Sequence, residues 1–125
     1  MQTKEAQQFN FDFEKLDVYK RALDFIDKVF DLTDNFSRNV QFSLGGQFRR
    51  AALSIINNIA EGSGKKSKDE KRRFYRYSLD SARECVPMIT ICLRRGQIDR
   101  QTHDRLREDC IIICQMLAKL ILATK

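Results

Sequence analysis

Residues 47–67 read QFRRAALSIINNIAEGSGKKS, and this segment predicts the central helix of the chain. A helix turns by about 100° per residue, which places the apolar side chains of the region on one stripe. The stripe comprises Leu44, Phe48, Ala51, Ala52, Ile55 and Ile59. We expect Ser43 to be the N-cap, because its hydroxyl can accept from an unpaired backbone amide. The helix should end at Gly62 or Gly64, because glycine accepts the left-handed backbone that closes many helices.

Upstream of this segment, a polar tail over residues 1–12 is expected to precede a first helix from residue 13 to about 36. Residues 34–43 interrupt the helical period with short polar side chains and predict a connection. One face of the first helix carries charges whose spacing permits ion pairs one turn apart. The possible pairs are Asp17 with Arg21 and Asp24 with Lys28.

Downstream, Ser67 and Glu70 have the S-x-x-E form of a capping box, which predicts the start of a third helix that extends to about residue 95. The inward stripe expected for this helix is Phe74, Tyr77, Ser78, Ser81, Cys85, Met88 and Cys92. A fourth helix, for which Asp99 is the expected N-cap, should run to about residue 123.

Four helices with short connections predict an all-α fold, an antiparallel up-and-down four-helix bundle over residues 13–123. A length of 125 residues fits one domain. The apolar faces of the first, third and fourth helices are wider than one bundle core requires. Because wide apolar patches are rarely left exposed to water, we expect a homo-oligomer.

The composition narrows the range of partners. A formal net charge of +6 and a pI near 9.3 favour RNA or DNA, an anionic membrane surface or an acidic protein. The longest apolar tract, residues 110–123, is shorter than the ~20 residues needed to span a bilayer, and Gln115 and Lys119 interrupt it. The first twelve residues do not resemble a signal peptide. We therefore expect a cytoplasmic protein with no membrane partner, whose four cysteines stay reduced.

The positive charge is concentrated in residues 65–76, where seven cations face two acidic residues and supply +5 of the net +6. Lys68, Arg72 and Arg76 follow one another one turn apart, so this row could track phosphates, with an affinity that falls as salt rises. The predicted nucleic-acid-binding residues are Lys65, Lys66, Lys68, Lys71, Arg72, Arg73, Arg76 and Arg83. A solvated helix start that only aids solubility, or a protein-binding surface, are the alternatives.

The adjacent arginines of the central helix fall on different faces. Arg50 lies on the polar face with Glu61, whereas Arg49 falls beside Ile56 and should be partly covered. For a half-buried arginine, a structural ion pair or a subunit contact is favoured over a ligand contact.

No catalytic or metal-binding constellation is evident. On neighbouring helices Cys85 and Cys110 can lie at one level, but Cys92 and Cys114 would lie too far away for four thiolates to share a tetrahedral zinc. The cysteines are better explained as small buried apolar residues. The only histidine, His103, has no partners at triad spacing, and GSGKKS lacks the spacing of a phosphate-binding loop. We expect no enzyme activity, no cofactor and no metal.

Several segments resemble one known family. They are RRAA (49–52), NIAEG (58–62) with the basic residues after it, LDVYKRALDF (16–25) and SKDEKRRFYRYSLDSARE (67–84). They resemble the four-helix bundle proteins encoded within intervening sequences of bacterial 23S ribosomal RNA genes, also called S23-like proteins. The resemblance extends over about residues 13–122. The accessory variability proteins of diversity-generating retroelements, which work with a reverse transcriptase, are more distantly similar.

This resemblance implies a bundle that assembles as a homopentameric ring and whose basic surface binds RNA or other nucleic acid. The marked positions of the family correspond here to residues that we interpret as structural or subunit-interface residues. They are Arg49, Arg50, Asn58, Glu61, Gly62 and Gly64. An oligomeric RNA-binding bundle is therefore the leading hypothesis, and a scaffold for protein contacts or an accessory to a reverse transcriptase are the alternatives.

Overall fold

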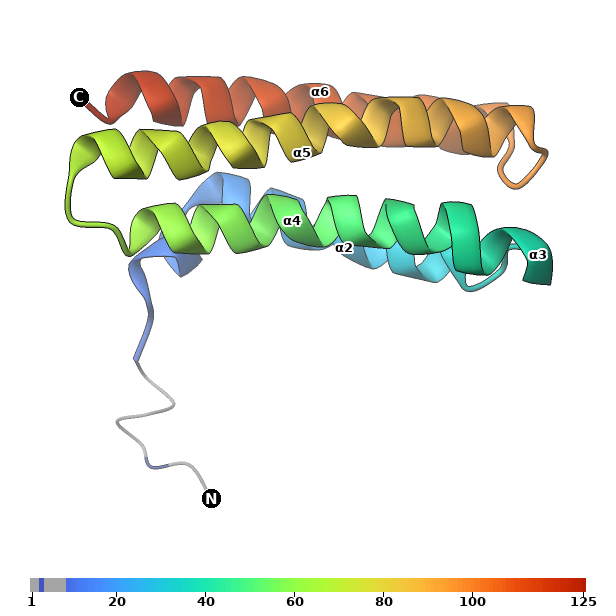
Figure 1. The fold of residues 1–125 in the computed structure, drawn as a ribbon, viewed down its shortest axis with the longest axis horizontal. Helices are drawn as coiled ribbons and strands as arrows, with labels where there is room; N and C mark the ends of the chain where they lie inside the picture. Colours follow the sequence, from blue (N-terminus) through green and yellow to red (C-terminus); the bar gives the residue numbers. More distant parts are fainter. Residues whose placement is uncertain (1–2, 4–8) are drawn as a thin grey trace.

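The computed structural model describes residues 3 and 9–125, so most of the tail predicted over residues 1–12 lies outside the described residues. Four long helices pack side by side and alternate in direction, and the described residues contain no strand (Figure 1). Their bounds are α2 Asp17–Thr33, α4 Gly46–Ser63, α5 Lys68–Arg94 and α6 Arg100–Ala123. Three short elements are the 3-10 helix η1 Asp12–Lys15, α3 Arg38–Val40 and the π-helix η2 Gln41–Gly45. The predicted antiparallel four-helix bundle is confirmed.

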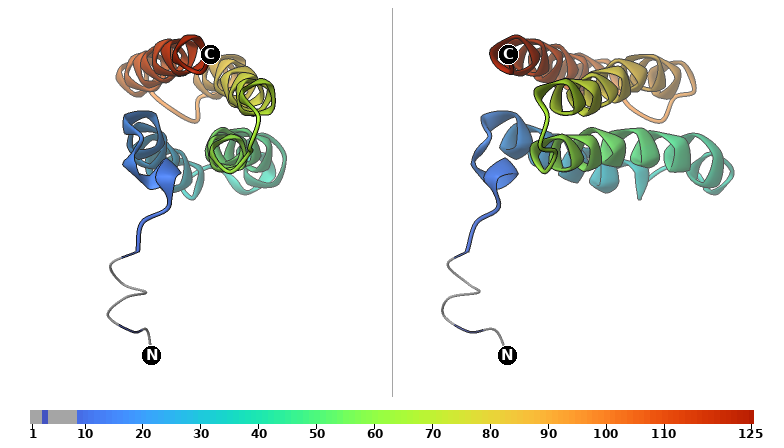
Figure 2. Two further views of the ribbon diagram at one scale, coloured as in Figure 1. Left: turned by 90° about the vertical axis from the view of Figure 1, so that its left-hand side faces the viewer. Right: turned by 60° about the vertical axis from the view of Figure 1, so that its left-hand side comes forward.

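The core lies between the four helices, which surround a common centre when the bundle is viewed from its end (Figure 2). The apolar stripe predicted for the central helix faces this core, with Phe48, Ala52, Ile55 and Ile59 fully buried and only Leu44 partly exposed. Complete burial of one such large side chain contributes about 1.5–3 kcal/mol. The buried residues of the other helices include Val18, Ala22, Phe25, Ile26 and Val29 of α2, Ala82, Cys85, Ile89 and Cys92 of α5, and Leu106, Cys110, Ile113 and Leu117 of α6.

The start of the central helix differs from the prediction. The backbone turns helical at Arg38 and continues through the wider π-turn of η2 into α4. Ser43 lies inside this run, where its hydroxyl donates to the carbonyls of Asn39 and Val40 at 3.4 and 3.5 Å, so it is not an N-cap. The prediction was wrong because short polar residues weaken the helical pattern without preventing a helix that tertiary packing supports.

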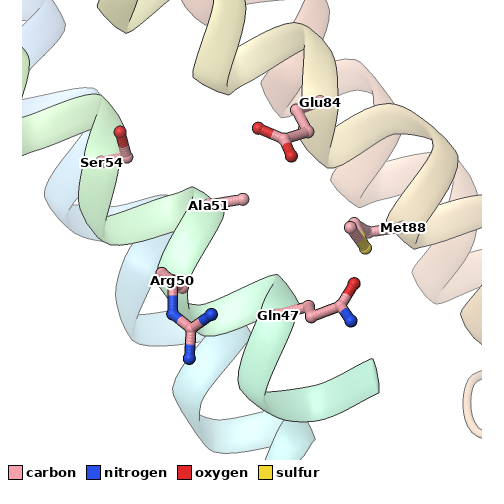
Figure 3. A pocket seen from close by; sticks show the side chains of 6 residues that line it. All are labelled: Gln47, Arg50, Ala51, Ser54, Glu84 and Met88. Carbon is pink, nitrogen blue, oxygen red and sulfur yellow. The ribbon is translucent and has the colours of Figure 1, made fainter. Parts of the chain in front are cut away.

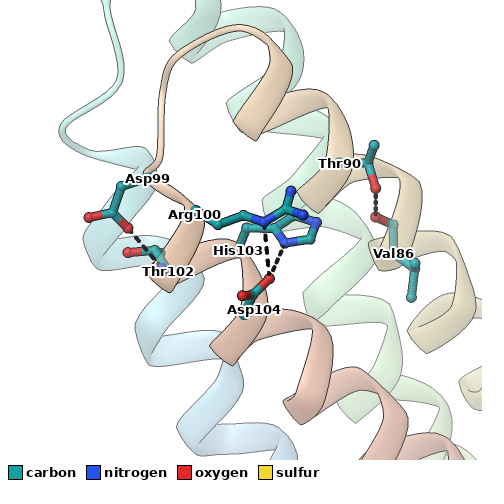
Figure 4. A network of polar contacts seen from close by, with 7 residues as sticks. All are labelled: Val86, Thr90, Asp99, Arg100, Thr102, His103 and Asp104. Atoms are coloured by element: carbon teal, nitrogen blue, oxygen red, sulfur yellow. Dashed lines mark hydrogen bonds and ion pairs between the residues drawn. The ribbon is translucent and has the colours of Figure 1, made fainter.

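The N-caps of the last two helices agree with the prediction. The Ser67 hydroxyl accepts a hydrogen bond of 3.1 Å from the backbone amide of Glu70. The Asp99 carboxylate accepts one of 2.8 Å from the amide of Thr102 (Figure 4). Each side chain pairs an amide that the first turn of a helix leaves without a partner.

Glycine plays different parts at the ends of α4 and α5. Gly64 caps α4 with a right-handed φ of −83°, so the left-handed cap expected there is wrong. The left-handed glycine is Gly96 after α5, at φ 69°, where the amide of Gln97 bonds the carbonyl of Cys92 at 2.9 Å. Gly62 is needed for space, because a Cβ added to it would lie 2.8 Å from Cε1 of Tyr75.

This close approach decides which aromatic residue of α5 faces the core. Tyr75 is buried beside Gly62, whereas Tyr77, predicted to point inward, is 44% exposed. The neighbouring Ser78 is buried and its hydroxyl donates a hydrogen bond of 2.7 Å to the carbonyl of Ile55. The buried face of α5 is thus rotated by a fraction of a turn from the predicted one. The pattern could not distinguish the two faces, because residues 74, 75, 77 and 78 all suit a helix–helix interface.

The ion pairs of α2 connect helices instead of lying within one helix. Arg21 and Lys28, expected to pair with aspartates one turn away, both contact Asp109 of α6. No described helix is both long and apolar enough to cross a membrane.

Candidate nucleic-acid interface

The basic segment predicted from the sequence lies at one end of the bundle. It covers the connection between α4 and α5 and the first turns of α5, next to the carboxyl terminus and to η1 (Figure 1). The chain direction explains this position, because α4 ends and α5 begins here. The eight predicted nucleic-acid-binding residues divide into groups with different partners.

Two of the cations are engaged within the fold. Lys71 donates from Nζ to the carbonyl of Ser63 at 2.8 Å and so pairs one of the carbonyls left open at the end of α4. Arg72 donates to the carbonyl of Thr124 and also pairs with Asp69, which ties α5 to the end of α6. Both side chains have structural roles that the sequence did not indicate.

Two further cations make exposed ion pairs and lie over aromatic rings. Arg73 pairs with Glu70 at 3.1 Å, and its guanidinium lies 5.3 Å from the ring centroid of Phe74 and 5.9 Å from that of Tyr77. Lys65 lies 3.7 Å from a Glu61 carboxylate oxygen and 4.9 Å from the Phe74 ring centroid. Exposed ion pairs contribute at most about 1 kcal/mol, so a phosphate can replace the carboxylate at little cost.

Three exposed cations are left without such contacts. Within residues 3 and 9–125, the side chains of Lys66, Lys68 and Arg76 make no hydrogen bond or ion pair. Lys68 and Arg76 are eight residues apart on α5, which is about 12 Å along the helix axis. We call Lys65, Lys66, Lys68, Arg73 and Arg76 the basic corner.

Arg83 lies two turns beyond the basic corner on the same helix. Its charge lowers the pKa of the Cys114 thiol on α6, but burial is the larger effect and leaves that pKa above its ordinary value. Arg83 is exposed and lies seven residues after Arg76, so it continues nearly the same face of α5, close to the seam with α6.

Aromatic side chains border the basic corner on two sides, and the sequence did not assign them to it. On α5, the Phe74 and Tyr77 rings are 5.5 Å apart at 84°. On the other side, Phe11 and Phe13 line a cavity of about 340 Å³ together with Lys65. The remaining lining residues are Ala60, Glu61 and Gly64. The alternation of Phe9, Phe11 and Phe13 was the one available signal for the second aromatic group.

The arginine pair lies near the opposite end of α4. Arg49 is half-buried, donating from Nη2 to the Gln41 carbonyl at 3.4 Å, while its buried Nη1 has no partner among the described residues. The guanidinium thus packs against η2. It lies so close to Gly45 that an added Cβ there would be only 3.1 Å from Nη1. Arg50 is exposed and lines a shallow cavity between α4 and α5, and its guanidinium points away from Glu84 of α5 (Figure 3). The motif arginines therefore lie about four turns before Lys65, the first residue of the basic corner.

The other marked residues of α4 have local partners. The Asn58 amide donates to the carbonyl and the hydroxyl of Ser54 at 2.8 and 3.0 Å. The Ser81 hydroxyl of α5 donates to the same Ser54 hydroxyl at 2.8 Å, which links the two helices. Glu61, Gly62 and Gly64 lie at the basic end, where Gly62 provides room for the ring of Tyr75.

The cysteines and the histidine form separate, small clusters. The buried thiols of Cys85 and Cys110 are neighbours, and the interaction with Cys85 together with burial raises the pKa of Cys110. Among the described residues, no three potential ligands cluster as a metal site. His103 contacts Asp104 at 2.8 Å, and Arg100 reaches the same carboxylate at 3.8 Å (Figure 4). In the described part of the chain, no serine or cysteine hydrogen-bonds to His103.

Comparison with known proteins adds a family and a fold. The family model described as 23S rRNA-intervening sequence protein matches residues 14–119. A crystal structure of a protein of unknown function from the S23 ribosomal protein family of Bacteroides thetaiotaomicron superposes with a TM-score of 0.77. The two chains are 22% identical, and the match covers 83% of this chain and 94% of the other, so it shows a shared fold. No curated protein matches the chain significantly.

Proposed function

The chain belongs to the family of 23S rRNA-intervening sequence proteins, and on that premise we propose that it is a non-enzymatic protein that binds RNA through the basic corner. The observation that carries the proposal is the unpaired state of Lys66, Lys68 and Arg76 within the described residues. Lys66 and Lys68 flank the amino terminus of α5, where a cation opposes the helix dipole at a cost of a few tenths of a kcal/mol. No contact within the described chain offsets this cost, whereas a row of phosphates would.

The cations that are already bonded within the fold are not suitable for a test of RNA binding. Lys71 and Arg72 hold helix ends together, so their replacement would confuse binding with stability. The informative variant therefore combines Lys66→Gln, Lys68→Gln and Arg76→Gln. A matched control combines Arg38→Gln, Arg95→Gln and Arg107→Gln, which removes the same charge from exposed positions away from the corner.

Binding of a labelled ribosomal RNA hairpin is measured across a salt series for wild type and both variants. The slope of log affinity against log salt is negative, and each lost phosphate contact reduces its magnitude by roughly 0.7–0.9, so the slope of the corner variant should be smaller in magnitude by about 2. The control should keep the wild-type slope to within about 0.5. Salt-independent binding by the wild type, or equal slopes for the two variants, would contradict the proposal.

We propose in addition that the bundle self-associates, as the family resemblance to a homopentamer implies. Large apolar side chains are 40% or more exposed on all four helices, at Leu23, Leu53, Ile91, Ile111 and Leu122. Exposed apolar side chains are common singly, but their presence on every helix is consistent with contacts between copies. Multi-angle light scattering at micromolar concentration should give a mass well above 14.7 kDa, and a monomer would refute this proposal.

A scaffold that binds only proteins, or an accessory to a reverse transcriptase, are the alternative functions. Under either alternative, RNA binding by the wild type is absent or insensitive to salt. The corner variant should then keep the protein's function. A neighbouring reverse transcriptase gene would favour the accessory role.

A further inference from the structure

The basic corner lies between two sets of aromatic rings, and Lys65 contacts both. On the α5 side it lies over the ring of Phe74, which packs edge to face against Tyr77. On the opposite side it lines the cavity formed with Phe11 and Phe13. Cations and aromatic rings therefore alternate across one end of the bundle.

The rings at the rim of this surface are open to solvent. Tyr77 is 44% exposed and Phe11 is 57% exposed. Phe9 is 63% exposed and contacts Phe11 with ring centroids 5.0 Å apart, while Phe11 and Phe13 are stacked at 5.6 Å and 16°. More than half of the surface of Phe9 and of Phe11 is therefore open to solvent, and large aromatic side chains are costly to leave in water.

The guanidinium of Arg73 extends the aromatic surface formed by Phe74 and Tyr77. It lies 5.9 Å from the Tyr77 ring centroid and 5.3 Å from that of Phe74, within the range of a cation–π contact. Aromatic rings and arginine planes are the groups on which unpaired bases stack. A perfect duplex cannot use them, because its base faces are covered by neighbouring base pairs and it offers mainly phosphates to a flat protein surface.

We infer that the ligand of the basic corner is an unpaired stretch of nucleic acid, with its phosphates at Lys66, Lys68 and Arg76 and its bases stacked on Tyr77 and Phe11. This inference rests on the proposed function, since it specifies which form of nucleic acid the same surface binds. The Glu61 carboxylate in the cavity is balanced by Lys65 at 3.7 Å, so its charge does not repel the strand unopposed.

The test compares two labelled RNAs by fluorescence anisotropy at one salt concentration, a 12-nucleotide single strand and a 12-base-pair duplex. The wild type should bind the single strand at least tenfold more tightly, since stacking on each of the two rings contributes roughly tenfold or more in affinity. Tyr77→Ala and Phe11→Ala should each weaken single-strand binding about tenfold and leave duplex binding unchanged. Tyr77→Phe keeps the ring and should bind like the wild type.

Phe42→Ala is the matched control, because Phe42 is 82% exposed but lies in η2 at the opposite end of the bundle (Figure 1). It should leave both affinities unchanged, and circular dichroism should show that every variant is folded. If the duplex binds as tightly as the single strand, or if the ring variants match Phe42→Ala, the inference fails while the salt-dependent binding of the proposed function stands. If neither RNA binds, both fail together.

Discussion

Lys28 of α2 donates a hydrogen bond of 2.9 Å from Nζ to Oδ2 of Asp109, a buried carboxylate on α6. Arg21, two turns earlier on α2, reaches the other carboxylate oxygen at 3.2 Å. One buried acid thus joins the first and last helices of the bundle, which are 81 residues apart in the chain at this point. Its two partners are partly exposed, so water screens the attraction and the hydrogen bonds carry most of its contribution.

Asp109→Ala should lower the free energy of unfolding by about 1–3 kcal/mol, because it removes two charge-assisted hydrogen bonds and leaves two cations close together. Urea denaturation followed by circular dichroism measures this change. Glu108→Ala on the exposed face of the same helix is the control and should change stability by less than about 0.5 kcal/mol. Equal stability of the two variants would show that the interhelical pairs contribute nothing.

Gly62→Ala should destabilise the protein, although alanine normally favours a helix by about 1 kcal/mol over glycine. The added Cβ would lie 2.8 Å from Cε1 of Tyr75 and 3.1 Å from Cβ of Phe74, so α4 and α5 must separate. We expect a net loss of about 1–3 kcal/mol. Gly64→Ala is the control, because its Cβ meets nothing closer than 3.7 Å. Thermal melts should separate the two variants, and a Gly62→Ala protein as stable as wild type would contradict the packing described.

The N-cap of α6 should contribute to the acid sensitivity of the protein. Hydrogen bonds from the side chain and backbone of Thr102 hold the pKa of Asp99 below its ordinary value of 3.8. A depressed pKa in the folded state means that the stabilisation is present above pH ~4 and is lost as the pH falls through the folded-state pKa. Asp99→Asn keeps a capping oxygen but does not titrate, so its stability should match wild type at pH 7 and fall less between pH 5 and 2. Parallel pH profiles would rule out this contribution.

The cysteines should differ in reactivity toward a thiol reagent such as Ellman's reagent. Burial raises the pKa of Cys92 to about 11, and the contact with Cys85 together with burial raises that of Cys110. Cys114 alone among the four free cysteines is partly exposed, although burial and the neighbouring Cys110 also raise its pKa. At pH 8 the native protein should therefore react slowly at about one thiol per chain, whereas all four thiols should react in denaturant. Cys114→Ser should abolish the native reaction, and rapid labelling of all four would contradict the buried positions.

Local chemistry made the helices predictable. The caps at Ser67 and Asp99 bond amides three residues away, so their hydrogen bonds depend on sequence spacing alone. The apolar stripe of α4 was predictable for the same reason, because helical periodicity places Phe48, Ile55 and Ile59 on one face whatever packs against them. The start of α4 was not, since the short polar residues around Ser43 give a weak local signal that packing overrides.

The basic corner was predicted in position but not in composition. Seven clustered cations located it, yet the sequence could not separate Lys71 and Arg72, which bond carbonyls of Ser63 and Thr124, from cations left open to solvent. The sequence also did not predict that Phe11 lines the same cavity as Lys65. These contacts join residues that lie 8, 52 and more positions apart in the chain.

The amino-acid sequence by itself thus determined four amphipathic helices, their order, most of their ends and the end of the bundle that carries the charge. The tertiary structure alone decided that Tyr75 faces the core and Tyr77 the solvent, and that Lys28 pairs with Asp109. The physical reason is the rotation of each helix about its own axis. Periodicity defines a face of each helix only to within a fraction of a turn, whereas the close packing of the Tyr75 ring on Gly62 fixes which face of α5 meets α4.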